Sequence, residues 1–272
     1  MSISLSLLLG LIATVIIAFA WPRYRLKQAI DRPFPEEWRR TLQRNLPIYR
    51  RMPSDLQRQL QRLIKQFLHQ KEFSGNGGLE INDEIRVTVA ASACLLLLNR
   101  PTSVYAGLRY ILVYPDAFMV RDEKVDDSGL ASSSMKGLLG QSWNNGKVIL
   151  SWADVLKGNS DFHDGQNVAL HEFAHQLDHE SGATNGAPLL GSTERYKSWA
   201  CVFTSEYETL QQAAFQGDSS LLDYYGAMEP AEFFAVVTET FFEKPQELAT
   251  QHQALFKELK QYYQVDPRDW QD

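Results

Sequence analysis

Two histidines and a glutamate at helical spacing are the residues of this chain best suited to chemistry. They stand in the run His171-Glu172-Phe173-Ala174-His175. On an α-helix, positions i and i+4 lie on one face about 6 Å apart along the axis, so both imidazoles can ligate one metal ion. The glutamate beside the first histidine can then take a proton from a zinc-bound water. This HExxH pattern is typical of zinc metallopeptidases and predicts hydrolysis of peptide bonds.

The residues around the motif favour a buried helix over a surface one. Val168, Leu170 and Leu177 place apolar side chains at helical spacing on either side of the motif. The alternative is a surface helix whose histidines and glutamate are merely solvated. On a partly buried helix the same polar groups need partners, because burying them unpaired is costly. A metal ion would supply that partner.

A catalytic zinc has three protein ligands, so the chain must provide a third. His179 continues the i, i+4 series, but the helix carries it a further 6 Å or so along the axis and about 40° round it, beyond a metal centred on the first pair. The metzincin arrangement requires a glycine and a histidine where this chain has Asp178 and Ser181. A carboxylate from a second helix remains.

That second helix is predicted to begin at Pro230, which suits the first turn of a helix. An apolar run follows and stops before Pro245. Glu232 falls in the first turn and Glu239 lies two turns later, and either could be the third ligand on spacing alone. The alternative for each is an ordinary solvated carboxylate.

Two segments make the chain resemble a known family. HEFAHQLD, from His171, and YGAMEPAEFFAVVTETFF, from Tyr225, are similar to segments of the Mlc titration factor A family of bacterial zinc metallopeptidases. The catalytic core of that family is similar to the peptidase domain of anthrax lethal factor. Further family-like segments are 67–71, 111–115, 140–143 and 148–152, and the resemblance extends from about Leu46 to Asp266.

The resemblance implies roles for five residues. It makes His171, His175 and Glu232 the ligands of one zinc ion (Zn2+), and Glu172 the general base of a zinc peptidase. Tyr225 matches a tyrosine that stabilises the oxyanion, and a phenol suits that task because it donates a hydrogen bond while remaining neutral at pH 7. The alternative for Tyr225 is an aromatic side chain that packs under its loop.

A second function stays open beside catalysis. The named family is thought to sequester a transcriptional repressor, so the resemblance also implies a zincin-shaped binding protein whose partner is a transcriptional regulator, with little or no catalysis. Otherwise the expected partner is a peptide or protein substrate. The presence of Glu172 and Tyr225 favours catalysis, since a pure binder needs neither. Asp178 is either an acceptor for an imidazole N–H or a surface aspartate.

The N-terminal segment predicts a membrane anchor. No side chain from Met1 to Pro22 is charged, and 5–21 is almost continuously apolar, near the minimum for a membrane span. Residues 23–66 carry twelve Lys or Arg against four Asp or Glu. Basic residues just after the span predict a single-pass anchor with the catalytic domain in the cytoplasm. A signal peptide cleaved near Ala20, followed by export, and a buried core helix are the alternatives.

The acidic remainder excludes nucleic acid as a partner of the catalytic domain. Residues 67–272 hold fifteen Lys or Arg against twenty-nine Asp or Glu, and a nucleic-acid-binding surface requires an excess of basic residues. The predicted partners are therefore a peptide or protein, and the membrane through the N-terminal helix.

The expected fold is α+β, a zincin-like metallopeptidase domain preceded by an N-terminal transmembrane helix. The predicted divisions are an anchor at 1–22, a basic juxtamembrane linker at 23–45, the peptidase domain at 46–266 and a tail at 267–272. Helices are predicted at 54–68 (from a capping box), 82–98, 167–180, 195–215 and 230–242, a strand at 108–114, and a hairpin at 141–151. Lys147–Ser151 is the candidate edge strand for an extended peptide substrate, or else a purely structural strand.

Overall fold

The computed structural model describes residues 2–116, 118–121, 135–138, 140–143 and 146–270, which are mainly helical. The α-helices are α1 (Ser2–Asp31), α2 (Glu36–Asn45), α3 (Ser54–Gln70), α4 (Asp83–Leu95), α5 (Trp152–Ser160), α6 (Val168–His179), α7 (Thr193–Gln216), α8 (Pro230–Glu243), α9 (Pro245–Gln251) and α10 (Gln253–Tyr263). Short 3-10 helices are η1 (Pro47–Arg50), η2 (Tyr224–Ala227) and η3 (Pro267–Asp269). The strands are β1 (Glu72–Gly75), β2 (Tyr110–Tyr114), β3 (Phe118–Arg121), β4 (Met135–Leu138), β5 (Gly140–Trp143) and β6 (Lys147–Ser151).

The main sheet has the strand order β1-β2-β6-β5, and β3 pairs with β4 in a separate antiparallel ribbon. β1 and β2, and β2 and β6, run parallel, whereas β5 and β6 are antiparallel. The prediction that Lys147–Ser151 forms an edge strand is therefore wrong. Because β2 occupies one side of this strand, its hairpin partner β5 must take the other, and β5 becomes the edge among the described strands.

The antiparallel pairing of β5 with β6 confirms the predicted hairpin. Of its turn, Asn144 and Asn145 lie outside the described residues. Gly146 has a positive φ of 71°, which glycine adopts without steric cost. A Cβ at this position would lie 2.7 Å from the carbonyl oxygen of Gly107, so the turn also requires glycine for close packing.

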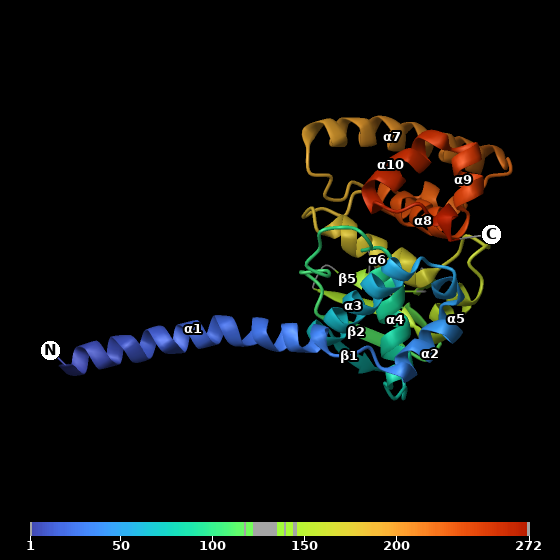
Figure 1. The fold of residues 1–272 in the computed structure, drawn as a ribbon. Helices are drawn as coiled ribbons and strands as arrows, with labels where there is room; N and C mark the ends of the chain where they lie inside the picture. The colour runs from blue at the N-terminus through green and yellow to red at the C-terminus, as the bar shows by residue number, and fades with distance from the viewer. Residues whose placement is uncertain (1, 117, 122–134, 139, 144–145, 271–272) are drawn as a thin grey trace, which may run out of the picture.

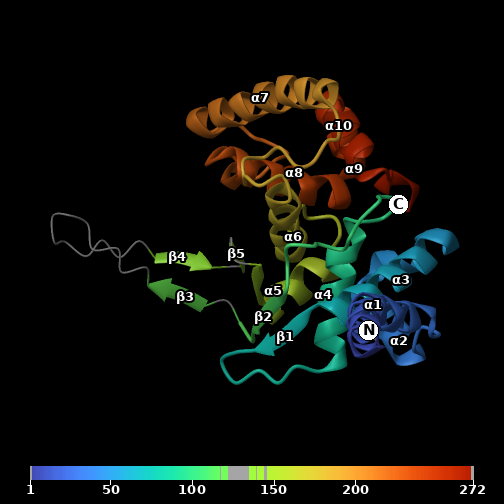
Figure 2. The ribbon, with the colours of Figure 1, turned by 90° about the vertical axis from the view of Figure 1, so that its left-hand side faces the viewer.

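Helix α6 lies between the sheet and a layer of helices. It contacts α8 on one side and β5 and β6 on the other. Figure 1 shows α7, α8, α9 and α10 above α6, and the sheet with α3, α4 and α5 below it; Figure 2 shows the same order after a quarter turn. The helix that carries the HExxH motif is thus in contact with both layers.

Aromatic side chains hold α6 and α8 in place from opposite sides. Phe173 of α6 packs on Phe67 of α3, with ring centroids 5.9 Å apart, and on Tyr105, at 5.4 Å. Phe234 of α8 packs on Trp199 of α7 at 5.8 Å. Full burial of such a side chain stabilises the fold by about 1.5–3 kcal/mol. The two helices are therefore fixed independently of the polar residues between them.

The predicted helices are confirmed, but the cap predicted for one of them is not. The helices predicted at 54–68, 82–98, 167–180, 195–215 and 230–242 correspond to α3, α4, α6, α7 and α8. The predicted capping box at Ser54 is wrong, because Pro53 is the N-cap and no side chain caps the helix. Gln57, its expected partner, instead donates to the carbonyl oxygens of Tyr49 and Met52, at 3.0 and 2.9 Å.

The N-terminal helix does not end where the predicted anchor ends. α1 continues through Pro22 into a charged stretch that ends at Asp31, and its C-terminal end contacts α3. The Lys65 ammonium donates to the carbonyl oxygens of Ile30 and Arg32. In Figure 1, α1 runs outward from this contact to the N-terminus.

The predicted membrane anchor is corrected by this structure. A span needs about 20 consecutive apolar residues, and in the described part of the chain no helix combines such a length with sufficient apolar character. The transmembrane helix, the single-pass location with a cytoplasmic catalytic domain, and the membrane as a partner are therefore not supported. The fold is mostly helical α+β with a small, largely parallel sheet. The boundaries at 23–45, 46–266 and 267–272 stay a prediction.

Candidate metal centre

Helix α6 presents two imidazoles on one face. Its N-cap is Asn167, whose side-chain oxygen accepts the Leu170 N–H at 3.1 Å. His171 and His175 follow one turn apart, with their ring centroids 4.8 Å from each other. Glu172, between them in sequence, is buried. The cap and the apolar packing of α6 thus set where both rings lie.

Helix α8 brings a carboxylate to the same place. Pro230 occupies its first turn, and Glu232 follows in that turn. The adjacent Phe233 and Phe234 are buried against α7, with Phe233 packing on Phe203 at a centroid distance of 5.7 Å. Because these aromatics hold one side of α8 on α7, Glu232 faces α6.

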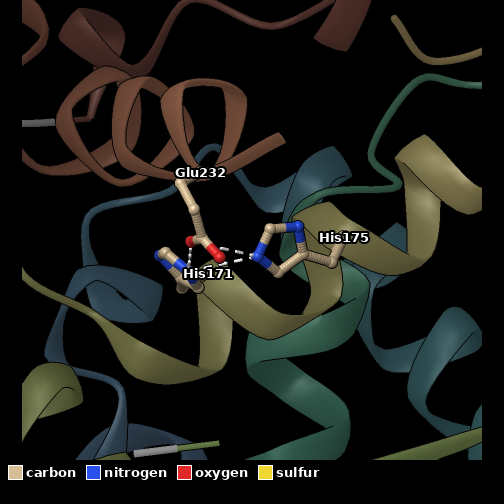
Figure 3. Close-up of side chains that lie close together, drawn as sticks. All are labelled: His171, His175 and Glu232. Carbon is tan, nitrogen blue, oxygen red and sulfur yellow. Dashed lines mark hydrogen bonds and ion pairs between the residues drawn. The ribbon is translucent and has the colours of Figure 1, made fainter. Parts of the chain in front are cut away.

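The three side chains converge, as Figure 3 shows. Glu232 Oε2 lies 2.9 Å from His171 Nε2 and 3.4 Å from His175 Nε2. The two Nε2 atoms are 3.2 Å apart. In the described part of the chain these three residues form the one cluster of His, Cys, Asp and Glu able to hold a metal ion.

This spacing fits a small tetrahedral metal. Zinc binds histidine nitrogens and carboxylate oxygens at about 2.0–2.2 Å, which places neighbouring ligand atoms of a tetrahedron about 3.3–3.6 Å apart. The observed separations of 2.9, 3.2 and 3.4 Å need to widen by only a few tenths of an ångström. The donor set, two imidazoles and one carboxylate, is also the one that catalytic zinc accepts.

Glu172 lies beside the cluster with unused hydrogen-bonding capacity. Its side chain is only 4% exposed, and its Oε2 atom has no hydrogen-bond partner among the described residues. Burial, opposed by the charges of His171 and His175, raises the pKa of Glu172 to about 7. A buried oxygen without a partner is costly in a fold and is characteristic of functional sites.

Tyr225 stands at the open side of the cluster. It lies on η2, where its backbone N–H donates to Asp223 Oδ1 at 2.8 Å. Its ring centroid is 5.8 Å from that of His171, and the side chain is half-exposed. Burial, and then the charges of Glu232 and Glu172, raise the pKa of Tyr225 to about 12. The phenol therefore keeps its proton at neutral pH and can donate it in a hydrogen bond.

Of the two carboxylates that spacing left open as ligands, Glu239 lies outside the cluster. Its Oε1 atom lies 2.7 Å from His171 Nδ1, on the far side of the imidazole from Glu232. Although burial lowers it, the charge of Glu239 and the hydrogen bond to Glu232 raise the pKa of His171 well above its usual value. A carboxylate at this nitrogen fixes the orientation of a metal-binding histidine.

Two residues that the sequence did not single out lie behind Glu239. The Asn167 N–H donates to Glu239 Oε2 at 2.5 Å, and Asn167 Nδ2 donates to Glu243 Oε1 at 3.1 Å. Glu243 is fully buried. The available signals were an asparagine directly before the motif helix and a glutamate one turn after Glu239, inside an apolar run.

Asp178 and His179 lie outside the cluster. Asp178 is fully buried, so its interpretation as a surface aspartate is wrong. Its Oδ2 atom accepts the Gly186 N–H at 2.6 Å and thereby anchors the loop after α6. His179 Nδ1 lies 3.2 Å from Thr184 Oγ1. Both side chains serve the loop that follows the helix.

Comparison with known proteins identifies the family. A family model described as glucose-regulated metallo-peptidase M90 matches residues 20–264. The chain is 41% identical over 267 residues to the uncharacterized protein slr2042 of Synechocystis sp., covering 98% of this chain and 97% of that protein. It is 32% identical over 252 residues to Mlc titration factor A of Klebsiella pneumoniae (strain 342), covering 92% of each, and 33% identical over 225 residues to Mlc titration factor A of Escherichia fergusonii, covering 82% and 84%.

These matches confirm the resemblance drawn from the two sequence segments. They cover the whole interval from α3 to α10, including the cluster between α6 and α8. The coverage and identity show that the chain is a metallopeptidase-like protein and a member of the glucose-regulated metallo-peptidase M90 family.

Proposed function

We propose that the chain is a zinc-dependent peptidase that hydrolyses peptide bonds. The proposed ligands of its single zinc ion are His171, His175 and Glu232. One observation carries the proposal: two imidazole nitrogens and a carboxylate oxygen converge within 3.4 Å of one another beside a buried glutamate that lacks a partner. A solvated helix surface would not concentrate these groups.

The chain's own residues supply the proton transfers and the orientation. A bound zinc ion would acidify water toward a pKa of about 7 and polarise the scissile carbonyl. Glu172 accepts the proton of the attacking water and delivers it to the leaving amine. Tyr225 donates a hydrogen bond to the oxygen that becomes negative. Glu239 keeps the His171 ring turned toward the cluster.

The edge strand nearest the cluster supports a peptide as the substrate. β5 contacts α6 and pairs with β6, so among the described strands it is the one with an outer edge beside the motif helix. An extended peptide can add to such an edge through main-chain hydrogen bonds. The same mode requires no particular side chains, which fits a peptidase.

The decisive variant is Glu172→Gln, which keeps the side-chain shape but cannot accept the proton. We expect kcat on a peptide substrate to fall by about 10²–10⁴-fold, the usual contribution of a general base, with unchanged zinc content. Glu180→Gln is the matched control, since this glutamate sits at the C-terminal cap of the same helix. Full turnover by Glu172→Gln would refute the proposal that this residue is the base.

The relatives favour a second candidate function, sequestration of a transcriptional regulator. Two of them carry the name Mlc titration factor A, and this chain could bind a regulator of that kind without cleaving it. Binding and catalysis separate in the Glu172→Gln variant. A pull-down with the purified regulator should give equal binding by wild type and variant if sequestration is the function, and peptide turnover should then be absent from both.

A further inference from the structure

A network of buried, hydrogen-bonded polar groups extends from the metal cluster toward the N-terminal end of α6. Glu239 bonds to His171, and the Asn167 N–H bonds to the other oxygen of Glu239. Asn167 Nδ2 in turn donates to Glu243 Oε1 and, at 3.2 Å, to Asn159 Oδ1. The bonds to Glu239 and Glu243 join residues 72 and 76 positions apart, and the bond to Asn159 joins residues eight apart, so the network links α6, α8 and α5.

Capping of α6 explains only part of this arrangement. The side-chain oxygen of Asn167 accepts the Leu170 N–H, and serine or aspartate would cap a helix equally well. The amide nitrogen is not needed for the cap, yet it donates to Glu243 and to Asn159. The asparagine amide accepts at the cap through its oxygen and, through its nitrogen, donates to a carboxyl group at the same time.

Glu243, at the end of this network farthest from the metal cluster, is costly to bury. Glu243 has no exposed surface, and its Oε2 atom has no hydrogen-bond partner among the described residues. It lies one turn after Glu239 on α8, so two carboxyl groups share one asparagine. An apolar residue at 243 would extend the apolar run of α8 and avoid the cost of burying a polar group. The fold alone therefore does not account for a glutamate here.

We propose that Asn167 and Glu243 are positioning residues for His171, which hold Glu239 in place so that the imidazole presents Nε2 to the metal. This inference rests on the proposed function, because it needs a metal at the cluster. Asn159 helps to fix the Asn167 side chain, because the Asn159 Oδ1 atom that accepts from Asn167 Nδ2 also accepts from the Ser92 hydroxyl, at 3.1 Å. Asn167 is thus braced from α5 and from α8, and its backbone N–H cannot drift away from Glu239.

Zinc affinity of the folded protein tests the proposal directly. Asn167→Ser keeps an oxygen for the cap but is too short to reach Glu243. We expect its zinc dissociation constant, measured by competition with a chromophoric chelator, to rise by about tenfold, as for other partners of metal-binding histidines. The cobalt-substituted variant should also show an altered visible absorption spectrum, because the ligand geometry changes.

Thr238→Val is the matched control for lost stability. Thr238 is buried on α8, between Glu232 and Glu239 in sequence, and hydrogen-bonds to the Tyr263 hydroxyl at 2.8 Å. The variant loses a buried hydrogen bond without touching Asn167. We expect a lower urea midpoint with an unchanged zinc dissociation constant and cobalt spectrum. A merely structural role for Asn167 predicts that both variants behave alike.

Two substitutions at Glu243 test the same proposal if Asn167→Ser does not fold. Glu243→Gln retains an oxygen for Asn167 Nδ2 and should bind zinc within about twofold of wild type. Glu243→Leu removes that acceptor and should weaken zinc binding by about tenfold. Wild-type affinity and an unchanged cobalt spectrum in both Asn167→Ser and Glu243→Leu would overturn the proposal while leaving the metal centre intact. Failure of the wild-type chain to bind zinc would instead overturn the proposed function.

Discussion

The two faces of α8 have opposite chemistry. The face toward α6 carries three glutamates, Glu232, Glu239 and Glu243, which are largely or fully buried. The face toward α7 and α10 carries aromatic residues such as Phe234 and Phe241, packed on other rings at centroid distances of 5.4–6.4 Å. The aromatic face stabilises the fold, whereas three carboxyl groups on one buried face destabilise it unless they have partners. That difference distinguishes the α6–α8 interface, where the proposed zinc ligands lie, from the aromatic interface.

The comparison predicts that the two faces can be disabled separately. Changes on the polar face should alter zinc binding or turnover with modest effects on folding. Changes on the aromatic face should lower the free energy of unfolding and leave zinc binding by the folded molecules intact.

The largest effect is expected from Glu232→Ala, which removes a proposed ligand. Zinc affinity should fall by about 10⁴-fold, or roughly 5.5 kcal/mol, because two imidazoles alone make an incomplete site. Glu229→Ala is the control, since Glu229 is an exposed glutamate three residues earlier. Competition titration with a zinc chelator measures both. Equal affinities for the two variants would mean that Glu232 is not a ligand.

Phe234→Ala should break the aromatic face. Truncation of a fully buried phenylalanine costs about 3–5 kcal/mol, and Phe234 has no exposed surface. Urea unfolding should show this loss, while zinc affinity at low urea stays within about threefold of wild type, as expected for a site with no shared contact. A parallel collapse of zinc affinity would show that the two faces are not separable.

Tyr225→Phe should affect turnover alone. Loss of one oxyanion donor lowers kcat by about 10²-fold, and removal of a hydroxyl from a half-exposed ring leaves folding and zinc binding nearly unchanged. Tyr224→Phe, at the neighbouring and similarly exposed tyrosine, is the control and should keep full kcat. Steady-state kinetics on one peptide substrate compares them. Equal kcat for the two variants would remove Tyr225 from the mechanism.

The smallest effect concerns pH and Glu243. Burial raises the pKa of Glu243 from an ordinary 4.5 to about 9, so the folded chain keeps a proton that the unfolded chain releases above pH 4.5 or so. The protonated Glu243 carboxyl therefore contributes its full stabilisation of the fold below about pH 4.5, and this contribution is lost as the pH rises through about 9. The glutamine of Glu243→Gln cannot titrate. Between pH 5 and 9, the free energy of unfolding should therefore decrease less for this variant than for wild type, by about 1–3 kcal/mol. Urea unfolding of the zinc-free proteins measures this, and identical pH profiles would contradict it.

The sequence predicted the polar face of α6 better than that of α8. The spacing of His171 and His175 depends only on local helix geometry, and the structure places the rings together. The choice between Glu232 and Glu239 depends on how α8 crosses α6, which the residues of neither helix reveal alone. Likewise, the interior position of β6 in the sheet follows from its parallel partner β2, whose paired residues lie 37 positions earlier in the sequence (Tyr110 opposite Lys147).

Local sequence signals were wrong or incomplete at three places, where the structure depends on adjoining or distant residues. Ser54 does not cap α3 because the preceding Pro53 takes the N-cap position. The apolar N-terminal segment predicted a span ending at Pro22, whereas α1 continues past that proline to Asp31. Asn167 was recognisable as a cap, but its bond to Glu243 joins positions 76 residues apart, which spacing within one helix cannot indicate.

Zinc titration of the metal-free chain beside its His171→Ala variant tests whether α6 and α8 together form one metal site. We expect one zinc bound per wild-type chain, and none by the variant at the same concentrations. Equal binding by both chains, or no binding by the wild type, would contradict it.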